Sequence, residues 1–274
     1  VGAANPSLTI DPRTLGFSTS SPLPQIYGDA APTFALNGVL PGDAVGTQWR
    51  DTTTGASYAP GLDVGTYTYG LSLAGTDSRN YRIVPATQTF ALQQRLIAAD
   101  FTGVSYVYGF GGPLTPALLD LLPGDDVKPI VAGTFGTSTM QVGALPFDTN
   151  AGTYGAQVIA LAGADGANYR VTSGAGTVVV TPRPVTYSFD GATYLYGDAR
   201  LGTAEAGQPR LTGVIAKDEA FIQPVLGFTD TAGTSSAPST RTPVGTYATS
   251  VAGLGSSGAA LPSNYVLDIA ASRP

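Results

Sequence analysis

The residue types that most often carry enzyme chemistry are missing from this chain. Its 274 residues include no histidine and no cysteine. Histidine is the commonest general base and transition-metal ligand near neutral pH, and the cysteine thiolate is a common nucleophile. A Ser-His-Asp triad, a thiolate metal site and a disulfide framework are therefore excluded. Carboxylate, guanidinium, hydroxyl and aromatic side chains remain.

Aspartates could support two kinds of chemistry. Paired carboxylates in a pocket hydrolyse glycosides, and clustered carboxylate oxygens bind calcium. Asp125-Asp126 is one such pair, but the chain has no Asp-x-Asp-x-Asp or Gly-Gly-x-Gly-x-Asp loop. We predict that the aspartates cap turns, with calcium binding as an alternative. We further predict that the chain is not an enzyme and has no catalytic residues.

Trp49-Arg50 is the one aromatic-cationic pair that is not repeated elsewhere in the chain. A tryptophan beside an arginine can stack on a sugar ring, and it can equally be a partly buried aromatic residue. The chain has a single tryptophan. We predict burial, and we keep Trp49 and Arg50 as the candidate ligand-binding residues.

A four-part series of aromatic and turn residues occurs three times. In each copy, Tyr-Gly is followed by Gly-Asp or Lys-Asp, then Gly-Thr-Tyr, then Asn-Tyr, and an arginine precedes the series. The arginines are Arg13, Arg95 and Arg183. The copies are Tyr27-Gly28, Gly42-Asp43, Gly65-Thr66-Tyr67 and Asn80-Tyr81; Tyr108-Gly109, Gly124-Asp125, Gly152-Thr153-Tyr154 and Asn168-Tyr169; Tyr196-Gly197, Lys217-Asp218, Gly245-Thr246-Tyr247 and Asn264-Tyr265. Repetition of this kind predicts an array of homologous modules.

The repeated residues have two interpretations. The tyrosines could form a platform for carbohydrate, and the arginines could bind an acidic polysaccharide. Because they recur at matching positions, we predict instead that the tyrosines form core and turns, with glycines of positive φ after them. We predict that the arginines form ion pairs or carbonyl hydrogen bonds across the module junctions.

Composition predicts strands joined by turns. Glutamate and lysine, the usual residues of helix surfaces, are scarce, whereas glycine and proline are abundant. We predict about five or six strands per module and at most one short helix, which would follow Asp43, Asp125 or Asp218. The first strands are expected at Ser7–Arg13, Thr89–Arg95 and Thr177–Arg183, with second strands at Leu15–Thr19, Leu96–Phe101 and Val185–Phe189. Third strands are expected at Phe34–Leu40, Leu114–Leu122 and Leu211–Ile215.

The module frame has two solutions. Residues 1–88, 89–176 and 177–274 form three modules if the strand at Thr177–Thr181 opens the third one. If that strand closes the second module, Leu8–Ile10 is left over from a preceding one. We prefer the first frame, because a leftover strand is an unpaired edge that invites aggregation. Pairing of Leu8–Ile10 within the first module is its test.

Net charge and hydropathy limit the classes of binding partner. The net charge is −6 and the pI is about 4.4, which disfavours nucleic acid and anionic lipid as partners. No apolar run approaches the roughly 20 residues of a membrane helix. We predict no membrane insertion and a monomer. The start at Val1 does not resemble a signal peptide, and we expect a segment cut from a longer exported bacterial protein.

The order Tyr-Gly-Asp, Gly-Asp, Pro243-Val244-Gly245-Thr246-Tyr247, Asn-Tyr and Val-Val-Val-Thr-Pro resembles the MBG/YDG repeat modules. These repeats occur in tandem in large exported bacterial proteins of the filamentous-haemagglutinin, two-partner-secretion type. The resemblance covers essentially the whole chain. The chain departs from the pattern at Phe110, which follows the second Tyr-Gly, and at Asp63, which stands where the third copy has Pro243.

The resemblance implies small, mostly β modules with a β-grasp-like α+β fold, for which an Ig-like β-sandwich is the alternative. It implies a rigid, elongated repeat segment of a cell-surface or released adhesin, acting in cell attachment, aggregation or biofilm. Neighbouring repeats of a longer chain would be its partners, together with a polysaccharide or host surface. The alternative function is a lectin-like module that recognises a matrix polysaccharide or a host glycan.

Overall fold

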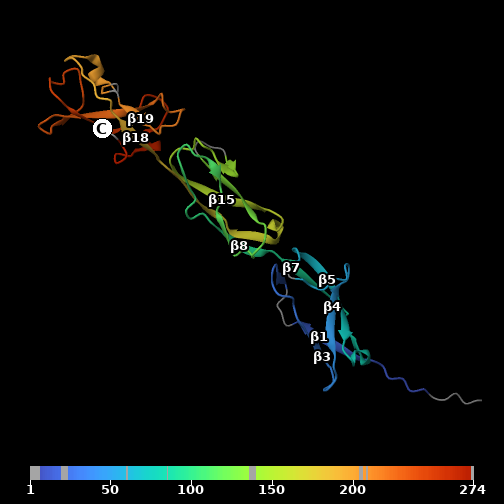
Figure 1. Ribbon diagram of the computed structural model, residues 1–274. Coiled ribbons are helices and arrows are strands. Elements are labelled where there is room, and N and C mark those ends of the chain that lie inside the picture. Colours follow the sequence, from blue (N-terminus) through green and yellow to red (C-terminus); the bar gives the residue numbers. More distant parts are fainter. Residues whose placement is uncertain are drawn as a thin grey trace, which may run out of the picture. The chain divides into compact units, whose positions relative to one another are not determined.

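The chain is mostly β. The computed structural model describes residues 7–19, 24–59, 61–84, 86–135, 140–203, 206–207 and 209–272. Strands make up 47% of it and helices 5%, and none of its helices reaches seven residues. The strands form several small sheets rather than one continuous one (Figure 1). The prediction of a mostly β fold is confirmed.

The chain divides into two compact units. Unit 1 comprises Val1–Ala99, Leu118–Pro129 and Ala160–Gly174, and unit 2 comprises Asp100–Ala117, Ile130–Ile159 and Ala175–Pro274. Each unit thus takes in part of the segment 89–176. The predicted module boundaries stay a prediction.

Three small sheets lie mainly in unit 1. Their strand orders are β3-β1-β6, β2-β7-β5-β4 and β11-β8-β16. The strands are β1 (Arg13–Thr19), β2 (Gln25–Ile26), β3 (Phe34–Asn37), β4 (Gly46–Asp51), β5 (Gly65–Ala74), β6 (Tyr81–Ile83), β7 (Thr87–Gln93), β8 (Arg95–Asp100), β11 (Ala117–Leu119) and β16 (Tyr169–Ser173). β1 is antiparallel to β3 and parallel to β6.

Four sheets lie mainly in unit 2. Their orders are β13-β12-β15-β17-β9, β10-β14, β19-β18-β23 and β21-β20-β22. The strands are β9 (Ser105–Val107), β10 (Gly112–Pro113), β12 (Lys128–Thr134), β13 (Met140–Val142), β14 (Ala144–Leu145), β15 (Gly152–Ala162), β17 (Ala175–Thr181), β18 (Arg183–Ser188), β19 (Arg210–Thr212), β20 (Ile222–Thr229), β21 (Ser235–Ser236), β22 (Ala248–Ser256) and β23 (Tyr265–Leu267).

Two strands, β7 and β17, supply alternating side chains to the cores. Phe90 and Leu92 of β7 are buried, as are Val178 and Val180 of β17, whereas their neighbours face outward. β7 lies between β2 and β5, and β17 lies between β9 and β15. Each therefore pairs with residues that precede it in the chain.

The expected strand at Leu8–Ile10 is wrong. β1 begins at Arg13, and Leu8 and Ile10 are 89% and 87% exposed. The physical reason is that β5 is paired on one side by β4 and on the other by β7. The edge of β5 that Leu8–Ile10 would need is thus already occupied.

The prediction of a short helix after Asp43, Asp125 or Asp218 is also wrong. Neither Asp43 nor Asp125 is followed by helix, and residues 216–221 form a turn in which the Ile222 N–H donates to the Asp218 carbonyl at 2.9 Å. Short 3-10 helices lie elsewhere: η1 (Ser78–Asn80), η2 (Gly166–Asn168), η3 (Ala199–Gly202) and η4 (Pro262–Asn264). The Asp43 and Asp125 carboxylates instead accept hydrogen bonds from Tyr81 and Tyr169.

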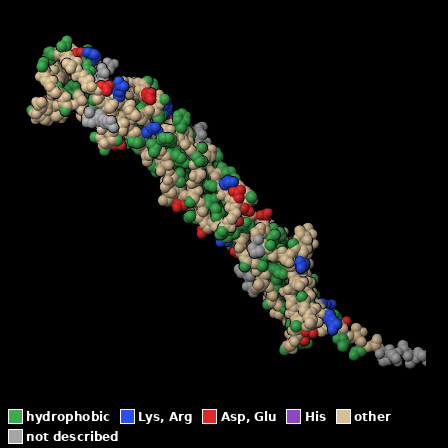
Figure 2. Space-filling view, viewed as in Figure 1, with side chains coloured by type: hydrophobic (Ala, Val, Ile, Leu, Met, Phe, Trp, Pro, Cys, Tyr) green, Lys and Arg blue, Asp and Glu red, His purple; other side chains and the backbone are tan. Residues whose placement is uncertain are grey.

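The surface is sparsely charged. Figure 2 shows acidic and basic side chains scattered among hydrophobic and neutral polar ones on the visible face. In the part of the chain that the structure describes, no helix is long and apolar enough to cross a membrane.

Candidate functional site

Trp49 lies in an aromatic cluster of unit 1. Its ring is 4.4 Å from that of Phe34, edge to face, and 4.8 Å from that of Tyr69. Tyr58 lies nearly parallel to it at 6.2 Å. Trp49 projects from β4 and is half-buried, because the strands β3 and β5 contribute the surrounding rings. The predicted burial is therefore partial.

A hollow of about 270 Å³ opens beside this cluster. Trp49, Arg50 and Tyr58 line it together with Ala31, Gln48 and Ser57. The exposed Arg50 donates from Nη1 to the Gly55 carbonyl at 3.3 Å and to Ser57 Oγ at 3.4 Å. The structure thus brings the two candidate ligand-binding residues to one hollow, where an aromatic edge and a guanidinium are both available.

The first Tyr-Gly pair is buried against residues far along the chain. The ring of Tyr27 meets that of Tyr169 edge to face at 5.4 Å, and both pack with Ile97. Gly28 has φ 82°, and a Cβ there would lie 2.1 Å from Leu122 Cδ1. The pair is therefore a packing contact between segments about 140 residues apart in sequence, which its sequence signal alone did not locate.

Polar contacts surround this aromatic pair. The buried Asn168 accepts from the Val64 N–H at 2.8 Å through Oδ1, and its Nδ2 donates to Asp63 Oδ1 at 2.8 Å. Arg95 donates from Nη1 to the Tyr27 carbonyl at 3.4 Å. These bonds satisfy the amide of Asn168, which would be costly to bury unpaired.

The second Tyr-Gly pair repeats this arrangement within unit 2. Tyr108 meets Tyr265 edge to face at 5.4 Å. Asn264 accepts from the Ala151 N–H at 2.8 Å and donates to Asn150 Oδ1 at 2.8 Å. Arg183 donates to the Tyr108 carbonyl at 3.5 Å. The same kinds of ring contact and hydrogen bond therefore surround the first and the second Tyr-Gly pair.

The arginines use different additional partners in the two arrangements. Arg95 lies 3.9 Å from the carboxylate of Asp29, whereas the guanidinium of Arg183 lies over the Phe110 ring at 4.8 Å. Cation–π contact replaces an ion pair, which explains how the second copy tolerates phenylalanine at this position. Arg13 donates to the Gly38 carbonyl at 3.0 Å, as Arg183 does to that of Gly213 at 2.7 Å.

Burial and nearby carboxylates raise the pKa values of the buried tyrosines. The pKa of Tyr27 is raised to about 12, first by burial and then by Asp125. Tyr108 and Tyr265 both donate to Asp218 Oδ2, at 2.8 and 2.6 Å. Burial, followed by this shared carboxylate, raises the pKa of both. These phenols therefore act as protonated hydrogen-bond donors rather than as bases.

The third Tyr-Gly pair has a different environment. Tyr196 is 65% exposed, and no described atom lies within 4 Å of where a Gly197 Cβ would be, although Gly197 has φ 86°. Asp198 caps η3 and forms two hydrogen bonds with the Arg200 guanidinium, at 3.1 and 2.7 Å. These bonds lower the pKa of Asp198 to about 2.

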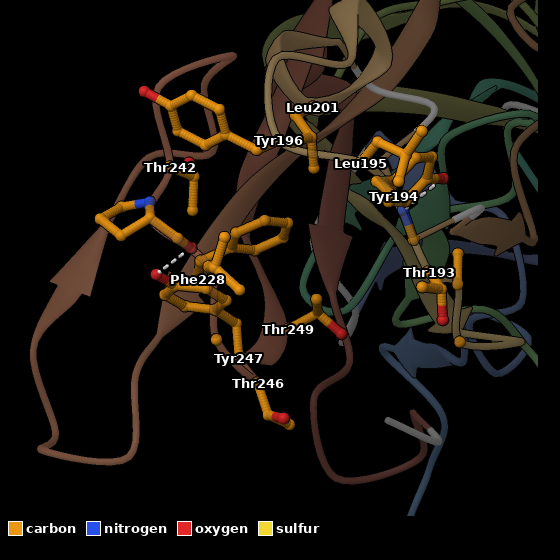
Figure 3. Close-up of a pocket in the computed structure, with 16 residues that line it drawn as sticks. Thr193, Tyr194, Leu195, Tyr196, Leu201, Phe228, Thr242, Thr246, Tyr247 and Thr249 are labelled. Atoms are coloured by element: carbon orange, nitrogen blue, oxygen red, sulfur yellow. Dashed lines mark hydrogen bonds between the residues drawn. The ribbon is translucent and has the colours of Figure 1, made fainter.

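A groove of about 480 Å³ lies next to Tyr196, between residues 191–196 on one side and 242–249 on the other. Figure 3 shows Tyr194 and Leu195 facing Phe228 and Tyr247 across it. The rings of Phe228 and Tyr247 stack at 5.7 Å, and Tyr194 Oη accepts from the Gly207 N–H at 3.1 Å. Its lining combines the apolar side chains of Leu201 and Phe228 with Gly191 and Gly245, which have no side chain to cover their backbone. Such a lining suits an extended peptide. No motif of the sequence analysis predicted this groove.

The remaining signature tyrosines have local roles. Tyr67, Tyr154 and Tyr247 each donate to the carbonyl four residues earlier, at 2.7, 2.7 and 2.8 Å. Tyr81 and Tyr169 are buried and donate to aspartates. All the signature tyrosines except Tyr196 therefore take part in local or core contacts.

The calcium alternative centred on Asp125-Asp126. Asp125 accepts from Tyr169, and Asp126 lies 3.0 Å from Lys128. Among the described residues, no group of three or more His, Cys, Asp or Glu side chains is placed to hold a metal ion.

No protein-family model matches the chain, and no curated protein matches it significantly.

Proposed function

We propose that the chain is a structural and adhesive repeat segment of a large secreted bacterial surface adhesin. In this proposal three small β modules follow one another as a rigid, elongated spacer that displays adhesive surfaces outside the cell. The sequence supports it through the threefold pattern that resembles the MBG/YDG repeats, and through the neutral, cysteine-free composition.

The recurring tyrosine pair is the observation that carries the proposal. Tyr27 packs on Tyr169 and Tyr108 packs on Tyr265, and in each case an asparagine ties two backbone segments together. A single residue, Gln94 or Pro182, separates the last strand before each junction from the next strand. Buried contact around so short a connection resists bending, unlike a flexible linker.

Strand pairing supports a frame for these modules. β7 and β17 pair with β5 and β15, which precede them. We therefore propose modules at 13–94 and 95–182, with the third beginning at residue 183. This proposed frame replaces the one that opens at residues 1, 89 and 177.

Small-angle scattering tests the spacer. Three modules of about 90 residues placed end to end give a radius of gyration near 30 Å, whereas one compact globule of the same length gives about 19 Å. We expect the larger value, with a linear cross-section region in the scattering curve. A radius close to the globular value would remove the stalk from consideration.

Attachment is tested separately from shape. Beads coated with the chain should adhere to cells or matrix more than beads coated with an unrelated acidic β protein. If both kinds of bead adhere equally, the chain is a spacer without adhesive surfaces.

The hollow beside Trp49 favours a lectin-like function as the second candidate. Its aromatic edge and the Arg50 guanidinium offer stacking and charge to a sugar ring. We expect glycan-array binding, if this function holds, to be lost in Trp49→Ala and kept in Trp49→Phe. Binding that survives Trp49→Ala would place the sugar elsewhere.

A further inference from the structure

The groove of unit 2 lies where the other sheets have a strand. In the described part of the chain, β22 is an edge strand and begins at Ala248. Its counterparts begin earlier, at Gly65 for β5 and at Gly152 for β15. Those glycines pair with Leu92 and Val180, whereas the matching Gly245 lines the open groove.

The opposite wall of the groove also corresponds to segments that pair with a strand elsewhere in the chain. The residues just before Tyr27 and Tyr108 form β2 and β9, which pair in parallel with β7 and β17. The N–H groups of Tyr27 and Tyr108 then donate to the carbonyls of Gln93 and Thr181, both at 2.9 Å. Leu195, the counterpart of Val107 just before the tyrosine, lines the groove instead. The slot beside residues 245–247 is thus bordered on its far side by the residue that corresponds to the ends of β2 and β9.

One described segment has the sequence of the strand that fits this slot. The segment Leu8-Thr9-Ile10-Asp11-Pro12-Arg13 aligns without gaps with Val178-Val179-Val180-Thr181-Pro182-Arg183. Both have an aliphatic residue at the first and third positions and end in Pro-Arg. The side chains of Val178 and Val180 are buried in their sheet, whereas Leu8 and Ile10 stand in solvent. Residues 8–12 form no strand in the structure.

We propose that the groove binds residues 8–11 of a second copy of this chain, by strand addition. The donated strand runs antiparallel to residues 245–247, with Leu195 on its other side. By the register of the two existing strands, Leu8 pairs with Tyr247, Thr9 with Thr246 and Ile10 with Gly245. Main-chain bonds supply affinity, and the inward Leu8 and Ile10 cover Phe228.

Exposed residues next to the donor and the groove continue the same interface. The Tyr27 turn packs against Leu122 and against Tyr169, which follows Asn168. The counterparts of Leu122 and Asn168 are Leu40 and Asn80, and both are exposed. Their natural partner is a Tyr-Gly turn, and Tyr196 is an exposed one. A donor copy therefore offers both the strand and the surface on which the acceptor's Tyr196 packs.

The contact joins two different surfaces, the strand at residues 8–11 and the groove. A pair of molecules joined in this way therefore need not form a closed dimer. A copy that accepts at residues 191–249 still presents residues 8–13 to a further copy. Such head-to-tail contacts generate open chains of molecules. The predicted monomer is then the state below the association midpoint. The proposal rests on strand pairing and goes beyond the adhesive role, which could fail on its own.

Sedimentation of the full chain, at concentrations up to about 1 mM, tests the association at weak affinities. We expect association that depends on concentration. Ile10→Asp should weaken it by about tenfold or more, because it buries a carboxylate without a partner. Thr9→Asp is the matched control: it adds the same charge on the outward face, where Val179 is partly exposed, and should change the midpoint by only about twofold.

Cysteine pairing identifies the surfaces, because the natural chain has no cysteine. Thr9→Cys and Thr246→Cys are made in separate molecules and mixed under mild oxidation. We expect rapid disulfide formation between them, as their counterparts Val179 and Thr153 are directly opposite. Ser250→Cys, four residues further along and roughly 13 Å away, is the control.

Three results would overturn the proposal. They are a chain that stays monomeric throughout, association unaffected by Ile10→Asp, and crosslinking of Thr246→Cys no faster than that of Ser250→Cys. The first two measurements use positions that are exposed in the isolated molecule, so loss of folding does not confuse the outcome.

Discussion

The first and third Tyr-Gly turns share a sequence and a backbone but differ in what covers them. Gly28 and Gly197 have φ values of 82° and 86°. Tyr27 is buried with Tyr169 and Ile97, whereas Tyr196 stands mostly in solvent. The turn itself therefore does not determine burial. What decides it is whether a surface with an asparagine, a tyrosine and a leucine or isoleucine lies against the turn.

The second turn shows that this difference is one of partners rather than of chemistry. Tyr108 is covered by Tyr265 and by the asparagine Asn264, just as Tyr27 is covered in unit 1. The covering surface tolerates Ile215 in place of Leu122 beside the glycine. Substitutions made in matched pairs at covered and uncovered turns can therefore measure what the contact contributes.

The largest difference is expected for the tyrosine itself. Tyr27→Ala removes a buried ring and leaves a cavity, which destabilises by about 3–5 kcal/mol for large aromatic side chains. Tyr196→Ala removes an exposed ring and should change the free energy of unfolding by less than about 0.5 kcal/mol. Urea unfolding, followed by far-ultraviolet circular dichroism, which reports the strands of both units, gives the comparison. Equal losses of unfolding free energy in the two variants would show that the tyrosine stabilises its own turn and not the contact that covers it.

The glycines after the tyrosines should give the next largest difference. Alanine at either position has an unfavourable positive φ, which costs roughly 1 kcal/mol. At Gly28 the added methyl group also meets Leu122, and overpacking adds about 1–3 kcal/mol. Gly197→Ala should therefore show the backbone strain alone. The two unfolding free energies, compared with those of the natural chain, separate strain from packing, and identical values would contradict the close approach of Leu122.

The asparagines should follow. Asn168→Ala leaves the Val64 N–H and the Asp63 carboxylate without their partner and should cost about 1–3 kcal/mol. Asn80→Ala, at the exposed counterpart, should cost less than about 0.5 kcal/mol. Hydrogen exchange of the Val64 amide is the direct readout: it should become faster in Asn168→Ala and stay unchanged in Asn80→Ala. An unaffected Val64 amide in Asn168→Ala would mean that another group protects it.

Local features of the fold were predictable from sequence because they depend on neighbouring residues. Positive φ after each tyrosine follows from the Tyr-Gly step, and the alternating pattern of Thr89–Arg95 and Thr177–Arg183 indicated β7 and β17. The same pattern at Ser7–Arg13 misled, because a strand also needs a free edge and β7 occupies the one on β5.

The candidate site was predictable only in part. Trp49 and Arg50 are adjacent in sequence, so their shared hollow follows once β4 is in place. The contact of Asn168 with Asp63 joins residues 105 positions apart, and short-range spacing carries no information about such a pairing. The groove depends on which strand is missing beside β22, and that is a property of the assembled sheet rather than of any motif.

The smallest expected effect is the pH dependence of the covered turn. Tyr27 has a folded-state pKa of about 12, first because it is buried and then because it lies near Asp125. An unfolded tyrosine has a pKa of about 10. Between these values the unfolded chain releases a proton that the folded chain keeps. The contribution of Tyr27 is therefore fully present below pH 10 and is lost as the pH rises toward 12.

For Tyr27 alone, the free energy of unfolding should fall by about 1.4 kcal/mol between pH 9 and pH 11. Urea unfolding of the natural chain, Tyr27→Phe and Tyr196→Phe at both pH values measures it. Other buried tyrosines add to the fall in all three proteins, so the difference between them is the signal. Tyr27→Phe should lose less stability on alkalinisation than the natural chain, and Tyr196→Phe should follow the natural chain. The same pH dependence in Tyr27→Phe and the natural chain would mean that the covered turn does not hold its phenol protonated, and that burial at this junction is looser than the contacts with Tyr169 and Ile97 require.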